Sequence, residues 1–214
     1  MRRRSFVPAL GFQVLTPFYD AFIALTMREA RFREMLLEQM DLRSVRTVAD
    51  AGCGTGTLAV MLKRRAPHAC ITGIDLDPDM IRRARRKAAK AGVEIRFENR
   101  HAAALPLEDG SVDLAVSTLL FHHLLDQEKI AALREIRRVL RLGGILHLLD
   151  FGKPANRAIA ASFGLLRRID GRANTETNAR GLLPSLVTAA GFWSVRRRTR
   201  MNTVFGTLDF LTAF

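Results

Sequence analysis

Two groups of residues in this chain are suited to chemistry. The first is the stretch TVADAGCGTG, residues 47–56, in which three glycines follow a short apolar run. Glycines between a strand and a helix let the backbone pass close to a bound ligand. The second is the pair His122 and His123, because an imidazole can accept a proton near neutral pH. The sequence therefore suggests cofactor binding combined with proton transfer.

The spacing of the glycines limits the kind of cofactor. A dinucleotide fingerprint requires G-x-G-x-x-G, but from Gly52 the chain gives Gly-Cys-Gly-Thr-Gly, so the third glycine comes one residue early. A phosphate-binding P-loop is excluded more firmly, since no Gly-Lys-Ser/Thr follows. Asp75 ends the next apolar run, about twenty residues on, where a carboxylate binds ribose hydroxyls in nucleotide-type sites. Nicotinamide enzymes and methyltransferases both use this arrangement.

Apolar runs alternate with helical patterns along most of the chain, which predicts a parallel sheet covered on both faces. Strands are expected at 45–51, 70–76, 94–100, 112–118 and 143–151, with two further candidates at 192–200 and 203–214. Helices are expected at 56–66, 78–92, 126–141 and 182–191, the third of them capped by Asp126. The polar stretch 168–181 is expected to be a loose segment that helps shape the acceptor pocket. The predicted fold is a Rossmann-like, doubly wound, seven-stranded, mostly parallel α/β sheet.

Composition bounds the remaining possibilities. The chain has 214 residues and 48% hydrophobic content, enough for one substantial α/β core. Cys53 and Cys70 form neither a disulfide framework nor a metal cluster, so we expect a cytoplasmic setting and no metal. The net charge of +13 would suit a polyanion or an anionic membrane, but ordinary solvated helix faces would look the same.

The amino-terminal part combines a basic cluster with an apolar run, but Pro8, Pro17 and Asp20 interrupt it and no cleavage site for a secretory signal follows. We expect residues 1–40 to form a helical cap on a Rossmann-like domain at 41–214. Two uses of residues 6–27 remain open, a helix over the active-site mouth or a peripheral contact with a membrane surface.

Four motifs in register then resemble one family. DAGCGTG at 50–56, GIDLDPDM at 73–80, ALPLEDGSVDLAVSTLLFHHL at 104–124 and ALREIRRVLRLGGILHLLDFG at 132–152 together look like a class I S-adenosylmethionine-dependent methyltransferase. The chain is most similar to the small-molecule branch that includes the ubiquinone and menaquinone biosynthesis methyltransferases. The resemblance implies S-adenosyl-L-methionine as cofactor and S-adenosyl-L-homocysteine as product.

The resemblance also assigns roles to residues. It implies that Asp50 and the backbone of the glycine loop hold the methionine end of the donor, and that Asp75 binds its ribose. The full set of cofactor-binding residues that it implies is Tyr19, Asp50, Gly52, Cys53, Gly54, Asp75, Leu76, Met80, His101, Ala102 and Ser117. His101 departs from the family pattern, because many relatives place an aspartate there against the adenine amino group.

The exit of the fourth strand narrows the acceptor. It lacks the Asn/Asp-Pro-Pro-aromatic tetrad that grips a flipped base, so nucleic acid is a less favoured partner. We expect direct in-line transfer to a small, hydrophobic acceptor, with His122 as candidate catalytic base. The alternatives are an RNA or protein methyltransferase that uses its basic surface, an inactive cofactor-binding regulatory protein, and a nicotinamide-dependent oxidoreductase. The oligomeric state is left open.

Overall fold

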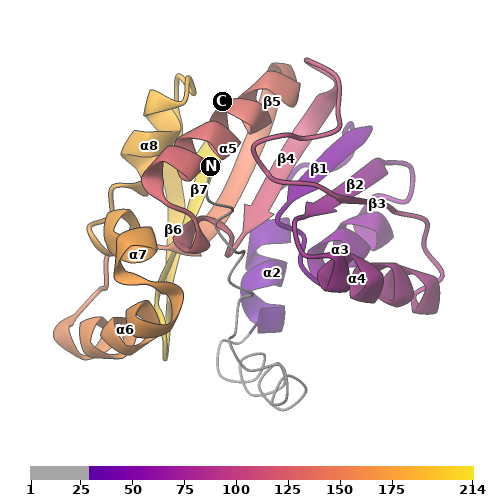
Figure 1. Cartoon of the computed structure of the whole chain (residues 1–214). Coiled ribbons are helices and arrows are strands. Elements are labelled where there is room, and N and C mark those ends of the chain that lie inside the picture. Colours follow the sequence, from indigo (N-terminus) through magenta and orange to yellow (C-terminus); the bar gives the residue numbers. More distant parts are fainter. Residues whose placement is uncertain (1–28) are drawn as a thin grey trace, which may run out of the picture.

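Seven strands form one sheet in the computed structural model, which describes residues 29–214 (Figure 1). The strand order is β3-β2-β1-β4-β5-β7-β6, and all neighbours run parallel except β7, which is antiparallel to both β5 and β6. The strands are β1 (Thr47–Ala51), β2 (Cys70–Asp75), β3 (Arg96–Asn99), β4 (Val112–Thr118), β5 (Leu140–Phe151), β6 (Val195–Thr203) and β7 (Gly206–Ala213).

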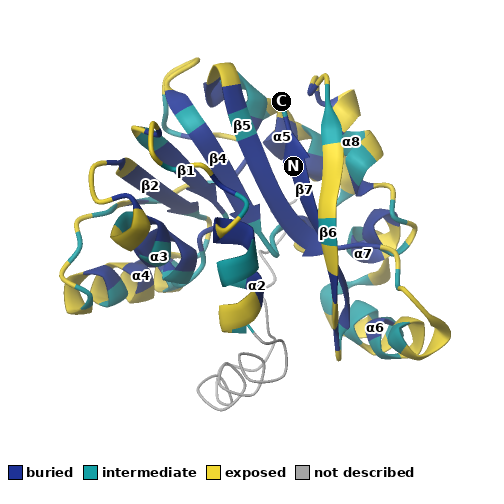
Figure 2. Ribbon diagram, turned by 180° about the vertical axis from the view of Figure 1, so that it is seen from behind, coloured by how far each residue is buried: buried dark blue, intermediate teal, exposed yellow. Residues whose placement is uncertain are grey.

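Helices cover both faces of this sheet, because each central strand is apolar on both sides. Val48 packs into one core cluster and its neighbour Ala49 into the other. The first cluster takes side chains from α2 (Glu29–Leu37), α3 (Thr57–Arg65), α4 (Pro78–Lys90) and α6 (Arg157–Asp170). The second takes them from α5 (Asp126–Val139) and α8 (Leu183–Ala189). Figure 2 shows buried central strands, and an exposed β6 at the edge. The predicted doubly wound α/β fold is confirmed.

From the sequence, no helix was predicted between residues 152 and 181, where the structure has α6, and the prediction was wrong at two more specific points. The polar stretch 168–181 is not a loose segment, because it contains the end of α6 and all of α7 (Arg172–Ala179). Asp126 is not the cap of α5. The N-cap is Leu125, whose amide donates to the Glu128 carboxylate at 2.8 Å, and Asp126 is the first residue of the helix. The Asp126 side chain instead binds α7, as described below.

Of the predicted cap at 1–40, only the part from residue 29 lies within the described chain. There α2 packs Phe32, Leu36 and Leu37 into the same core cluster as Leu62 of α3. The division of the chain at residue 40 stays a prediction. Within residues 29–214, no helix has both the length and the apolar character needed to cross a bilayer.

Phe32 provides a test of how α2 is held. Its side chain is fully buried, so Phe32→Ala should leave a cavity and lower the free energy of unfolding by about 3 to 5 kcal/mol. Arg31→Ala, at an exposed position of the same helix, is the matched control and should change it by less than about 0.5 kcal/mol. Urea denaturation followed by circular dichroism measures both. Equal stabilities of the two variants would contradict this packing.

Candidate active site

The site lies where the parallel strands β1, β2, β4 and β5 end. The carboxyl ends of parallel strands meet at one edge of a sheet, and ligands of doubly wound folds bind there. Asp50 is near the end of β1, Asp75 ends β2, and Asp150 is near the end of β5. The helices α6 and α7 lie at this same edge, below β6 and β7 in Figure 1. Three buried or half-buried carboxylates therefore surround the point where a ligand is expected.

Asp50 is the least satisfied of the three. Its side chain is fully buried, and neither carboxylate oxygen has a hydrogen-bond partner within the described chain. Burial raises the pKa of Asp50 to about 7, against the opposing charge of Arg33 and with a further rise from Asp75. Arg33 of α2 has a buried Nε that is also unpartnered among the described residues. An unpaired buried carboxylate beside an unpaired guanidinium nitrogen is costly unless a ligand satisfies both.

The glycine loop uses its amides internally. Gly52 and Cys53 both donate to the carbonyl of Ile74, at 2.8 and 3.0 Å, and Gly54 donates to Asp75 Oδ2 at 2.8 Å. A ligand at this loop would therefore meet carbonyl oxygens rather than free amides. Gly52 also needs to be glycine for steric reasons, because its φ is 76° and a Cβ would lie 2.9 Å from the Leu120 side chain.

The Asp75 carboxylate is held by two backbone amides and can accept further hydrogen bonds. Oδ2 accepts the Gly54 amide and Oδ1 accepts the Asp77 amide at 2.9 Å, which leaves each oxygen able to accept another hydrogen bond. Burial raises the pKa of Asp75, and the two backbone hydrogen bonds oppose that rise. Leu76 beside it is 44% exposed, and Met80 is half-buried one helical turn away.

Three other predicted cofactor residues have defined surroundings. His101 accepts the Ala103 amide on Nδ1 at 3.0 Å, so its remaining nitrogen carries the hydrogen. Ala102 is buried next to it. Ser117 is fully buried and donates to the Ala51 carbonyl at 2.8 Å, so its hydroxyl joins β4 to β1. Tyr19 lies outside the described residues.

Cys53 is a packing residue in chemical terms. The thiol is buried and free, and burial raises its pKa well above the ordinary range. It is therefore neither a thiolate nucleophile nor a soft metal ligand. The predicted use of its backbone at the glycine loop stays a prediction.

The chain turns sharply after β4. Leu119 adopts a φ of 55°, the left-handed region that a leucine rarely occupies. The following residues form a short 3-10 helix, η1 (Phe121–His123), which carries both histidines to the carboxyl edge. Strain at such a position is stored where the surrounding structure requires it, which is typical of functional sites.

Asp150 is the residue that fixes His122. The carboxylate is fully buried, and its Oδ1 lies 2.9 Å from Nδ1 of His122. Phe121 donates its amide to Oδ2 at 2.7 Å, and Phe151 donates its amide to Oδ1 at 2.7 Å. The amide of Asn178 in α7 donates to Oδ1 at 3.2 Å. A carboxylate with this many donors is an acceptor, so His122 holds its proton on Nδ1 and presents Nε2.

Charge sets the protonation of the histidine pair. Burial disfavours the charged form of His122, but the charge and hydrogen bond of Asp150 outweigh it and, with the charge of Asp170, raise its pKa. His123 behaves in the opposite way. The charge of His122 and burial lower the pKa of His123 to about 3, so this imidazole stays neutral. Of the pair, His122 is the imidazole whose protonated form the neighbouring carboxylates stabilise.

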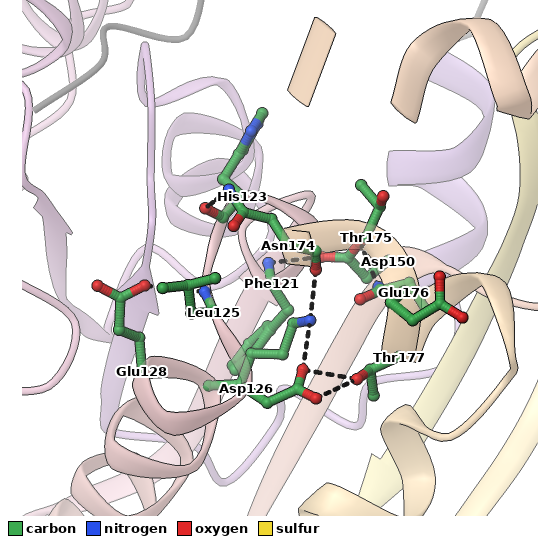
Figure 3. A network of polar contacts seen from close by, with 12 residues as sticks. Phe121, His123, Leu125, Asp126, Glu128, Asp150, Asn174, Thr175, Glu176 and Thr177 are labelled. Carbon is green, nitrogen blue, oxygen red and sulfur yellow. Dashed lines mark hydrogen bonds and ion pairs between the residues drawn. The ribbon is translucent and has the colours of Figure 1, made fainter. Parts of the chain in front are cut away.

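The helix α7 is fastened to this region by polar contacts, which Figure 3 shows from close by. Thr177 donates to both carboxylate oxygens of Asp126 at 2.6 Å. The fully buried Lys129 donates to Asp126 Oδ1 at 3.1 Å and to the Asn174 carbonyl at 2.6 Å. Asn174 donates to the carbonyl of His123 at 2.9 Å. The ends of α5, α7 and η1 therefore form one connected unit.

The structure brings His122 together with two carboxylates that sequence reasoning missed, Asp150 and Asp170. Sequence reasoning also missed Arg33 near Asp50, Asn174 at the His123 carbonyl and Asn178 at Asp150. Asp150 had a usable signal, because it stands near the end of an apolar strand as Asp50 and Asp75 do. Asp170 had none, since it lies in a stretch expected to be a loop.

The comparisons with known proteins agree with this geometry. A family model described as a methyltransferase domain matches residues 48–144. A demethylmenaquinone methyltransferase of Thermus thermophilus is 38% identical over 160 residues, 74% of this chain and 70% of that protein. A malonyl-[acyl-carrier protein] O-methyltransferase of Geobacter sulfurreducens is 35% identical over 147 residues, 68% of this chain and 53% of that protein. The latter match spans only about half of that relative.

A solved structure shows the same fold. Magnesium protoporphyrin IX methyltransferase from Synechocystis, solved with bound SAM, has a TM-score of 0.65 at 20% sequence identity. The similarity covers 94% of this chain and 85% of that one.

The sheet order and the glycine loop define a Rossmann-like domain of the cofactor-binding kind. With the relatives above, they show that the chain belongs to the class I S-adenosylmethionine-dependent methyltransferases, in the group related to the quinone methyltransferases. It is an enzyme, its cofactor is S-adenosyl-L-methionine, and the resemblance stated from the sequence is confirmed.

The link between Asp150 and His122 can be measured directly. Asp150→Asn removes both a negative charge and a strong acceptor, so the pKa of His122 should fall. The chain has five histidines, which makes an NMR titration of the imidazole protons practicable. Asp109→Asn, at a side chain that is 81% exposed, is the control and should leave the titration of His122 unchanged. The same titration curve in both variants would show that Asp150 does not charge-stabilise His122.

Proposed function

We propose that this methyltransferase acts on a small, largely apolar acceptor that carries a hydroxyl group on an aromatic ring, of the quinol type. The observation that carries the proposal is the buried pair of Asp150 and His122 at the exit of β4, which presents Nε2 as a proton acceptor. The name of the Thermus relative, a demethylmenaquinone methyltransferase, supports the same class of acceptor.

The residues at the donor edge fit the cofactor. S-adenosylmethionine supplies, when bound, a methyl group on a positively charged sulfur. Its amino-acid end carries an ammonium and a carboxylate. Asp50 offers two unpartnered oxygens, and Arg33 offers its unpartnered Nε, while its terminal nitrogens bind Glu29. We assign the ammonium to Asp50 and the backbone carbonyls of Gly52, Cys53 and Gly54, and the carboxylate to Arg33.

The nucleoside end is assigned to the next strand. Asp75 has lone pairs free for the two ribose hydroxyls, while Leu76 and Met80 flank the adenine. The amide of Ala102, for which the described residues provide no acceptor, would donate to a ring nitrogen. His101 would donate a hydrogen bond to the adenine from its second nitrogen, whereas an aspartate at this position would accept one from the adenine amino group. Ser117 acts through the Ala51 carbonyl that it holds, and Tyr19 is kept as a contact from the amino-terminal segment.

The proposed chemistry begins with one proton transfer. His122 Nε2 takes the proton of the acceptor hydroxyl, and the freed electron pair raises the nucleophilicity of the oxygen or of a ring carbon conjugated with it. That atom forms the new bond to the methyl group as the bond from methyl to sulfur breaks, and the sulfur keeps the electron pair. Where that atom is a ring carbon, its hydrogen then leaves as a proton and the ring oxygen regains one, which restores the aromatic ring. Asp150 stabilises the imidazolium formed in this step. No covalent enzyme intermediate is required.

The partner and location predictions belong to this proposal. An apolar quinol partitions into membranes, so a peripheral membrane contact of the amino-terminal segment would serve a cytoplasmic enzyme of this kind. A basic surface that serves RNA is the competing use of the net charge of +13.

Donor binding should depend on Asp50 and on pH. Because the pKa of Asp50 is about 7 and an ammonium ligand favours the carboxylate form, binding of S-adenosylhomocysteine should release a proton below pH 7. Its affinity should therefore weaken as pH falls from 7 to 5.5, by up to about tenfold per unit. Calorimetry in buffers of different ionisation enthalpy measures both effects.

The matched variants for this test are Asp50→Asn and Asp79→Asn. Asp50→Asn should weaken the binding affinity for S-adenosylhomocysteine by about tenfold to a hundredfold and abolish its pH dependence. The second, at a side chain that is 55% exposed, should do neither. Affinity that is flat between pH 5.5 and 8 in the wild type would refute the assignment of Asp50.

The base is tested by His122→Gln with a demethylated naphthoquinol as acceptor and radiolabelled methyl donor. Loss of a general base should lower kcat by about 10² to 10⁴ while S-adenosylhomocysteine binds within about twofold of wild type. His68→Gln, at an exposed position between α3 and β2, is the control and should keep full activity. Label that enters total RNA but not the organic extract would overturn the acceptor class. An unchanged kcat in His122→Gln would overturn the base.

A further inference from the structure

Asp170, the last residue of α6, is a second carboxylate at the histidine pair. Its side chain is only 8% exposed, and Oδ2 lies 3.9 Å from Nε2 of His122 while Oδ1 lies 3.7 Å from Nδ1 of His123. These separations exceed hydrogen-bond distance, and no described residue donates a hydrogen bond to this carboxylate. A nearly buried carboxylate without a donor is expensive, and burial accordingly raises the pKa of Asp170.

The position of Asp170 is fixed by backbone contacts rather than by its own side chain. Asn174 donates to the Asp170 carbonyl at 3.1 Å and to the His123 carbonyl at 2.9 Å, so one amide ties the end of α6 to η1. Phe163 of α6 packs on Phe151 at 5.2 Å, and Phe151 contacts the His122 ring edge-on at 4.9 Å. The carboxylate is therefore held at the open nitrogen of His122 by packing from two sides.

The charges of Asp170 and Asp150 beside His122 favour a neutral acceptor group over an anionic one. A hydroxyl group about 2.8 Å from Nε2 could donate its single hydrogen to that nitrogen, while Oδ2 of Asp170, 3.9 Å from Nε2, places a negative charge beside the imidazolium that forms. A carboxylate guest would instead bring a third negative charge beside Asp150 and Asp170. Lys129 does not offset this, because its ammonium is already bound to Asp126 and the Asn174 carbonyl.

We propose that Asp170 is a positioning residue that places a negative charge beside the reactive nitrogen of His122, so that it stabilises the imidazolium formed there and selects a neutral hydroxyl over a carboxylate. This inference rests on the proposed role of His122. It separates the chain from an enzyme whose acceptor is an acid, as the name of the malonyl-[acyl-carrier protein] relative states for that protein. It also assigns a use to the α6–α7 segment, which delivers this side chain to the site.

The first test is the titration of His122. The charged and titratable groups that face it are Asp150 of β5, Asp170 of α6, His123 of η1 and Lys129 of α5. Asp170→Asn removes one of the two negative charges, so the pKa of His122 should fall and the rising limb of kcat against pH should move to lower pH. Asp170→Glu should restore the wild-type profile. Arg168→Gln, exposed on the same helix, should leave it unchanged.

The second test measures selection without turnover. Calorimetry with S-adenosylhomocysteine present compares two probes of equal skeleton, 2-naphthol and 2-naphthoate. The wild type should bind the naphthol at least about tenfold more tightly, and Asp170→Asn should close most of that gap while S-adenosylhomocysteine affinity is unchanged.

The outcomes separate the two proposals. If Asp170→Asn changes neither the pKa of His122 nor the preference for naphthol over naphthoate, this inference is overturned, whatever the activity of the variant. A shift of both in a protein whose His122→Gln variant retains its kcat would support the Asp170 contacts and refute the base. Loss of S-adenosylhomocysteine binding in Asp170→Asn would show a structural role and count against positioning. If Asp170→Asn does not fold, Asp170→Ser removes the same charge and carries the same comparisons, with Asp170→Glu as the variant that keeps the charge.

Discussion

The active-site region depends on a single carboxylate that has no access to water. Asp150 is fully buried, and such a group is stable only if donors surround it. The amides of Phe121 and Phe151, the side chain of Asn178 and the ring of His122 supply them. These donors come from η1, β5 and α7, so satisfying one charge fixes the relative positions of three elements. The orientation of His122 is a consequence of this requirement.

Much of the sheet could be predicted from the sequence, because its central strands are buried on both faces and so appear as apolar runs between helical patterns. β1, β2 and β4 were located to within about two residues for this reason. The segment α6–α7 could not be predicted in the same way. The helix α7 has the sequence RANTETNA, which has no apolar stripe, and its stability comes from contacts such as Thr177 with Asp126. Such contacts join residues far apart in sequence and leave no periodic signal.

Site residues could be predicted where the residues that act together are close in the sequence. Asp50 and Asp75 follow from a strand end and a glycine loop, which adjacent letters reveal. The nature of the loop contacts did not follow, since only the structure shows that the Gly52 and Cys53 amides bind Ile74. Asp150 follows a rule that the other two aspartates already obey. Asp170 reaches His122 across the fold, so no spacing in the sequence could have announced it.

The left-handed backbone at Leu119 has an evolutionary consequence. The turn there brings Leu120 against Gly52, where it fills the space that any side chain at residue 52 would need. Glycine, asparagine and aspartate adopt this conformation at lower cost than leucine, while valine, isoleucine and threonine adopt it at higher cost. During divergence, residue 119 should therefore accept both polar and apolar side chains but exclude those branched at Cβ. Changes at residue 120 should be coupled to Gly52, which follows the neighbouring strand β1.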